Sequence, residues 1–132
     1  MEEYIVFIVS LESNIKFKIT ILVDEAEKSD DIVLKAYVDG KEVSASDYNY
    51  LPAYQKFRDA LLSRGYGIKC NGSRINAVQS EMMGANDKIY LVKLGQKALR
   101  KDIVSLYDYA DINEFPDTQA QKEFFKKWCE SI

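Results

Sequence analysis

Apolar residues in the first third of the chain recur at every second position, which is the period of β-strands. Residues 4–11 are apolar on both strand faces, which predicts a strand covered on both sides. In residues 15–23 the odd-numbered positions are apolar, and they alternate at the start of the run with the polar Lys16, Lys18 and Thr20. The polar residues 12–14 separate these two runs, so we expect them to form an antiparallel hairpin.

A second hairpin is predicted over residues 32–44, because Asp39-Gly40 supplies the positive φ angles of a tight two-residue turn. The pattern then changes to the helical period. Residues 51–64 are predicted to form a helix, with Pro52 in its first turn and Gly65 after its end.

Three short strands are predicted next, at residues 66–70, 88–94 and 99–109. The third is ambiguous, because its apolar positions also fit a helix, but its many β-forming residues favour a strand. A last helix is expected over residues 118–131, capped by Asp117 or the next residue. Its expected buried stripe consists of Phe124, Phe125, Trp128 and Cys129.

This order of elements predicts an α+β fold. We expect one mainly antiparallel sheet of about six or seven strands, with two helices packed on one face. The length of 132 residues, with 47% apolar and 30% charged residues, fits a single domain over residues 1–132.

Cysteine content and the chain start point to the cytoplasm. Cys70 and Cys129 are the only cysteines, so we expect reduced thiols, although a bridge between them stays open. The apolar run near the start is short and follows acidic residues, which argues against a signal peptide. No run reaches membrane-spanning length, so we expect no membrane association.

Charge is distributed unevenly. Residues 54–101 contain ten bases and three acids, whereas the rest of the chain contains eight bases and eighteen acids. Acids gather in residues 24–31 and 102–121, as either a solvated face or a surface for a basic partner. The basic segment 54–101 leaves open a nucleic-acid or small-ligand binding module. Its bases are scattered over several predicted elements, however, so we expect no nucleic acid as a partner.

The residues offer little catalytic chemistry. The chain has no histidine, the commonest general base and metal ligand. Cys70 and Ser73 flank an Asn-Gly turn signal, so we interpret this stretch as a structural turn. The alternatives are a binding loop centred on Arg74 and a catalytic role for one of the two nucleophiles. Asp108 and Asp111 form only an unspecific carboxylate pair for magnesium, so we expect no enzyme, metal or cofactor.

Two stretches carry a resemblance to a protein family: CNGSRINAVQSEMM at residues 70–83 and KIYLVKLGQKALRKDIVSLYDYAD at residues 88–111. The chain resembles the small immunity proteins that bacteria encode beside polymorphic toxins, particularly those of contact-dependent growth inhibition. The resemblance implies a cytosolic non-enzyme that binds a cognate protein toxin, often a nuclease, and blocks its active site or substrate path. It carries over no individual binding residue.

A nuclease surface that holds phosphate is basic, so carboxylates beside exposed tyrosines suit its recognition. We expect residues 107–117 to carry recognition, residues 24–31 to steer association, and Arg74 to be the next candidate. The candidate residues are Tyr107, Asp108, Tyr109, Asp111, Glu114, Asp117, Glu25, Glu27, Asp30, Asp31 and Arg74. Backbone pairing of an edge strand with the partner is the other route.

Overall fold

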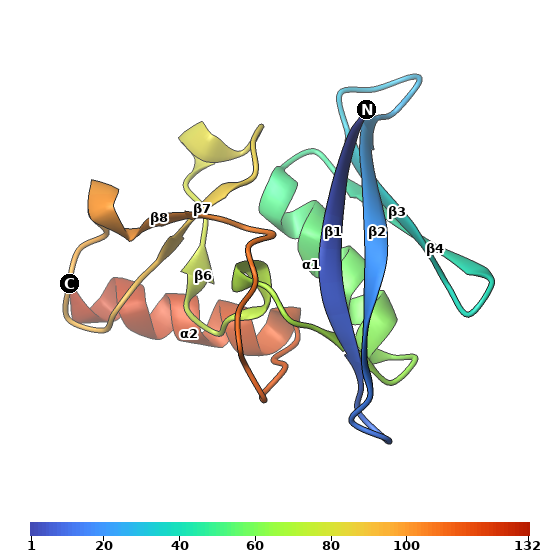
Figure 1. Ribbon diagram of the computed structural model, residues 1–132. Coiled ribbons are helices and arrows are strands. Elements are labelled where there is room, and N and C mark those ends of the chain that lie inside the picture. Colours follow the sequence, from blue (N-terminus) through green and yellow to red (C-terminus); the bar gives the residue numbers. More distant parts are fainter.

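The computed structural model describes residues 1–132 and has the predicted α+β architecture (Figure 1). Its larger sheet contains five antiparallel strands in the order β4-β3-β2-β1-β5. The strands are β1 (Glu2–Ser10), β2 (Lys16–Glu25), β3 (Ile32–Val38), β4 (Lys41–Asp47) and β5 (Tyr66–Ile68). Both predicted hairpins are present, and Asp39 and Gly40 have φ angles of 53° and 74°, as the second turn requires.

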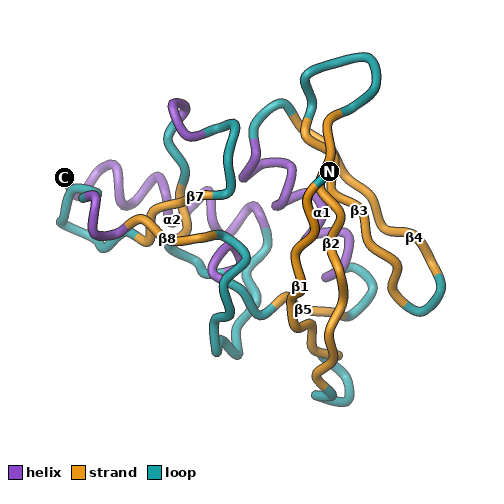
Figure 2. The backbone as a smooth tube through the Cα atoms, turned by 45° about the horizontal axis from the view of Figure 1, so that its top comes forward, coloured by secondary structure: helices purple, strands orange, loops and turns teal.

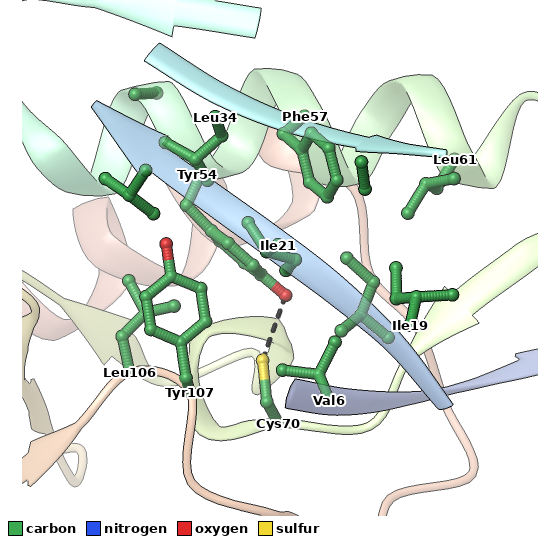
Figure 3. Packing of buried hydrophobic residues seen from close by; sticks show 14 of the residues in the cluster. Val6, Ile19, Ile21, Leu34, Tyr54, Phe57, Leu61, Cys70, Leu106 and Tyr107 are labelled. Atoms are coloured by element: carbon green, nitrogen blue, oxygen red, sulfur yellow. Dashed lines mark hydrogen bonds between the residues drawn. The ribbon is translucent and has the colours of Figure 1, made fainter. Parts of the chain in front are cut away.

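Helix α1 (Tyr50–Leu62) covers one face of this sheet and encloses the main core. Figure 3 shows Tyr54, Phe57 and Leu61 on α1, with Ile21 of the sheet close to them. These three helix side chains are fully buried, at 0% exposure. The helical spacing of apolar residues therefore predicted the packed side of α1 correctly.

The remaining strands form a second sheet instead of extending the first. Strands β6 (Ala77–Val78), β7 (Lys88–Leu91) and β8 (Ile103–Ser105) pair antiparallel in the order β6-β7-β8. Two- to four-residue strands separated by 3₁₀ turns change direction too often to continue a long sheet. The ambiguous segment 99–109 is neither a long strand nor a helix, because only β8 lies in a sheet.

Helix α2 (Thr118–Ser131) lies beside the second sheet (Figures 1 and 2). Asp117 is its N-cap, as predicted, and its Oδ1 accepts a backbone N–H of the first turn at 2.9 Å. The predicted buried stripe is wrong. Gln121 is the only buried residue of α2, Phe125 is 44% exposed, and Cys129 is an exposed free thiol.

The face of the larger sheet opposite α1 carries no helix (Figure 1). On this open face Ile5 of β1 is 68% exposed and Tyr37 of β3 is 61% exposed. The expectation that β1 is covered on both sides is therefore wrong at Ile5. Farther along the same face, Phe7 contacts Tyr109 and Val9 is only 5% exposed. The exposure of Ile5 is not explained by the core.

Candidate protein-binding site

The acidic segment after β8 runs beside the turn that follows β5. The backbone N–H of Asn71 donates to the carbonyl of Asp108 at 3.0 Å, and that of Ala110 donates to the carbonyl of Lys69 at 3.2 Å. These bonds hold the extended segment against the core. Two stretches that the sequence singled out separately, residues 70–74 and 107–117, thus form one region.

Tyr107 is buried in this region, so its prediction as a partner contact is wrong. It is 6% exposed, its ring stacks on that of Tyr4 with centroids 4.1 Å apart, and the hydroxyl of Tyr50 donates to its own at 3.1 Å. Burial raises the pKa of Tyr107 and raises that of Tyr50 to about 12. Tyr107 lies in the turn that follows β8, next to the fully buried Leu106, so its ring points into the core while that of Tyr109 points outward.

Tyr109 points outward and is 48% exposed. Its ring meets Phe7 edge-on, with centroids 5.7 Å apart. The Lys16 ammonium lies 5.2 Å from the ring centroid and donates to the hydroxyl at 3.4 Å. These contacts orient the ring, while about half of it remains available to a partner.

The carboxylates around Tyr109 differ in whether they already form contacts within the fold. Asp111 pairs with Lys69 at 3.2 Å, although the Asp111 side chain is 80% exposed. Asp117 caps α2. Asp108 and Glu114 are exposed and form no ion pair. The predicted acidic surface therefore exists, with two of its four carboxylates already in contacts of the fold.

A groove of about 710 Å³ opens between residues 74–76 and 112–116. Arg74 and Glu114 line it from opposite sides, so the structure brings together two candidates from distant parts of the sequence. Arg74 Nε donates to Asn71 Oδ1 at 3.1 Å, which anchors the guanidinium at the turn. Arg74 and Glu114 form no ion pair with each other.

The acidic segment 24–31 lies at the opposite end of the β1–β2 hairpin. Lys16 begins β2 next to Tyr109, whereas Glu25 ends the same ten-residue strand, roughly 30 Å away. Here the candidates Glu25, Glu27, Asp30 and Asp31 form no ion pair. The two acidic segments are therefore separate surfaces.

The candidate nucleophiles lie in the core. Cys70 and Ser73 are both 0% exposed, and the Tyr54 hydroxyl lies 3.2 Å from Cys70 Sγ and 2.6 Å from Ser73 Oγ. Burial raises the pKa of the Cys70 thiol, which disfavours the thiolate. A Cβ on Gly72 would lie 2.7 Å from Leu106, so this tight turn needs its glycine. The geometry supports the structural interpretation of the stretch.

The basic segment 54–101 does not gather into one patch. Lys56, Arg58 and Lys69 each form an ion pair with a carboxylate, at 2.9, 2.8 and 3.2 Å. The other bases of the segment are spread over the 70–74 turn, β7, a 3₁₀ turn and loops. Nowhere in the chain do three Asp, Glu or Cys side chains lie close enough to hold a metal ion, so Asp108 and Asp111 lack a third ligand.

Sequence reasoning missed a buried polar network centred on Arg58, which is 0% exposed. Its Nη2 donates to Gln121 Oε1 at 2.8 Å, and its Nε donates to Asp59 Oδ1 at 2.8 Å. Its Nη1 is the one buried side-chain nitrogen or oxygen without a partner.

Gln121 extends this network to the candidate site. Its Nε2 donates to the carbonyls of Gly72 at 3.0 Å and Arg74 at 2.7 Å, so α1, α2 and the 70–74 turn are joined. A signal for the network was present. Arg58 follows Tyr54 by four residues, so it lies on the buried side of α1.

No protein-family model matches the chain, and no curated protein matches it. Neither helix is long and apolar enough to cross a membrane. The geometry around Tyr109 therefore carries the functional assignment.

Proposed function

We propose that the protein is an immunity protein that binds a basic toxin domain and occludes its active site or substrate path. The binding surface consists of Tyr109 with Asp108, Asp111 and Glu114, beside the groove that contains Arg74. The observation that carries the proposal is the fixed presentation of Tyr109 between carboxylates. An exposed aromatic ring set among polar groups is the usual composition of an interface hot spot.

Preorganisation supports this assignment. Backbone hydrogen bonds from Asn71 and Ala110 hold the segment before any partner arrives. Less conformational entropy is then lost on association, so more of the contact energy appears as affinity.

The charges favour a cationic partner. Asp108 and Glu114 are free to pair with Lys or Arg of the partner. The exposed Asp111–Lys69 pair is worth little by itself, so Asp111 can exchange Lys69 for a base of the partner at small cost. A nuclease site that holds phosphate supplies such bases.

The test is a kinetic binding assay against the toxin domain encoded beside this protein's gene. Tyr109→Ala is expected to speed dissociation about tenfold or more, because it removes the central aromatic contact. Tyr48→Ala is the matched control, since Tyr48 is 68% exposed and lies outside the proposed surface. D108K/D111K is also expected to shorten the lifetime of the complex.

The acidic segment 24–31 is assigned a role in the rate of association, not in the lifetime of the complex. E25K/E27K is expected to lower the association rate and its salt dependence while leaving dissociation unchanged. All variants are first checked for native thermal unfolding. If Tyr109→Ala and D108K/D111K each change affinity by less than about 0.5 kcal/mol, recognition lies elsewhere and the proposed surface is wrong.

A further inference from the structure

A row of exposed side chains crosses the middle of the open face of the larger sheet. Ile5 lies opposite Thr20 in the β1–β2 register, and Tyr37 borders the same hollow of about 460 Å³. Ile5 and Tyr37 are 68% and 61% exposed. A solvated sheet face ordinarily alternates to polar residues, so uncovered apolar residues here indicate an interaction surface.

Charge changes sign along this face. The outward residues of β2 are, in order, Lys16, Lys18, Thr20, Leu22 and Asp24. On β1, Glu3 lies opposite Leu22, so its carboxylate adds to the acidic end. The face is therefore basic where β2 begins and acidic where β2 ends, with a neutral row between.

These end charges are not satisfied by other charges of the chain. Lys16, Lys18, Glu3 and Asp24 form no ion pair. The ammonium groups of Lys16 and Lys18 lie 4.8 and 5.4 Å from the centroid of the Phe7 ring, which orients them without neutralising them. Lys35, also on this face, is paired with Glu42 at 3.5 Å.

Such a pattern is complementary to itself. Two copies can face each other through this sheet with a two-fold axis midway between them. If the axis is perpendicular to the strands and level with the Ile5–Thr20 pair, the strands of the two copies run in opposite directions. Lys16 of each copy then faces Asp24 of the other, and Lys18 approaches Glu3. The central row faces its own equivalent, so apolar residues meet apolar residues. An isologous interface has this property, since one patch must serve both subunits.

We propose that two copies of this chain associate face to face through the open face of β1, β2 and β3. A partner of a single charge sign would complement only one end of this face, whereas a second copy complements both. The packed sheets would lie about 10 Å apart with strands aligned to within about 30°. The central toxin-recognition residues Tyr109, Asp108, Asp111 and Glu114 are not required. The two proposed surfaces nevertheless adjoin each other, because Lys16 contacts Tyr109 and Asp24 begins the acidic segment 24–31.

The size of the face sets the expected strength. Nine residues of β1 and the width of three strands give a face of at most roughly 30 Å by 15 Å, and the end that contains Phe7 and Val9 is partly covered by Tyr109 and buried. Specific interfaces bury about 800 Å² on each partner, so this one lies at the small end. We expect a dissociation constant in the range of about 1–100 µM.

The first experiment is sedimentation velocity with light scattering from about 1 to 300 µM protein, across the expected range of dissociation constants. Ile5→Arg is expected to raise the dimer dissociation constant at least about tenfold, because it sets two like charges opposite each other on the axis. Ile15→Arg is the matched control, since Ile15 is 63% exposed but lies in the hairpin turn outside the face. It should leave the constant unchanged.

The second experiment tests the charge pairing itself. K16E/K18E makes both ends of the face acidic, and E3K/D24K makes both ends basic, so neither variant should self-associate. An equimolar mixture of the two should form a heterodimer, an outcome that misfolding cannot produce.

A wild-type protein that stays monomeric throughout the range would overturn the proposal. It would also fail if the dimer tolerated Ile5→Arg, or if the mixed charge variants did not associate.

Discussion

The two helices are nearly equal in length but are held in place differently. Helix α1 has 13 residues, of which eight are buried, whereas α2 has 14 residues, of which Gln121 alone is buried. Polar contacts hold α2, such as the hydrogen bond from Trp128 Nε1 to the carbonyl of Gln96 at 2.8 Å. Both helices show apolar residues at helical spacing, so the spacing alone does not tell how deeply a helix is buried.

The sheets explain the difference. Helix α1 lies against a sheet of five strands, of which β1 to β4 have seven to ten residues and only β5 is short. Helix α2 lies beside strands of two to four residues, which offer too little surface to cover its apolar side. A helix can bury only as much of its apolar stripe as its neighbouring layer covers.

The largest expected effect is a difference in the stability lost when an apolar side chain is truncated in α1 and in α2. Phe57→Ala in α1 is expected to lower the free energy of unfolding by about 3–5 kcal/mol, because it leaves a cavity at a fully buried site. Phe125→Ala in α2 should cost less than about 1 kcal/mol, since the ring is 44% exposed. Urea unfolding of both variants measures this. Equal losses of stability would show that the apolar side of α2 is buried as deeply as that of α1.

The second effect concerns the polar attachment of α2. Gln121→Ala is expected to cost about 2–3 kcal/mol, because the Gly72 carbonyl and Gln55 Nε2 lose their partner. The Arg74 carbonyl and Arg58 Nη2 each lose one of two partners. Gln119→Ala on the exposed side of the same helix should change stability by less than about 0.5 kcal/mol. A small loss for Gln121→Ala would mean that water replaces the network.

Local signals explain what the sequence could predict. The hairpins, the turn at Asp39-Gly40, α1 and the Asp117 cap each depend on neighbouring residues, and the structure confirms them. The division into two sheets depends on which distant strands pair, and no local pattern contains that information. The side of the chain to which Tyr107 and Tyr109 point depends on the same pairing. Arg58 differs, since its burial was not predicted although its position four residues after Tyr54 puts it on the buried side of α1.

Alkaline pH should lower the free energy of unfolding, because several buried ionisable groups lie in the core beside α1. Burial raises the pKa of Tyr54, Tyr107 and Cys70, and raises that of Tyr50 to about 12. In the unfolded chain these groups ionise near their ordinary values of 10.0 for tyrosine and 9.0 for cysteine. The folded state keeps the protons longer, so this stability is complete below about pH 9 and falls as pH rises.

Each fully buried tyrosine should contribute a loss of about 1.4 kcal/mol per pH unit above pH 10. Urea unfolding between pH 8 and about 11 measures the slope. Tyr107→Phe removes one titrating group and should make the slope shallower. The exposed Tyr48→Phe is the control and should leave it unchanged. A slope that Tyr107→Phe does not alter would show that the buried hydroxyl is not linked to unfolding.

The smallest effect distinguishes the starts of the two helices. Asp117→Ala is expected to cost about 1 kcal/mol, because Asp117 Oδ1 accepts the backbone N–H of Ala120 at 2.9 Å. Asn49 precedes α1 but makes no side-chain capping bond, so Asn49→Ala should cost less than about 0.5 kcal/mol. Asp117→Asn keeps a capping oxygen without the charge, so it should retain most of the stability. If that variant unfolds like the wild type but binds the proposed toxin domain more weakly, Asp117 has two roles. Its oxygen caps α2, and its charge contributes to recognition. If Asp117→Asn and the wild type bind alike, Asp117 is a cap alone, and the proposed recognition surface ends at Glu114.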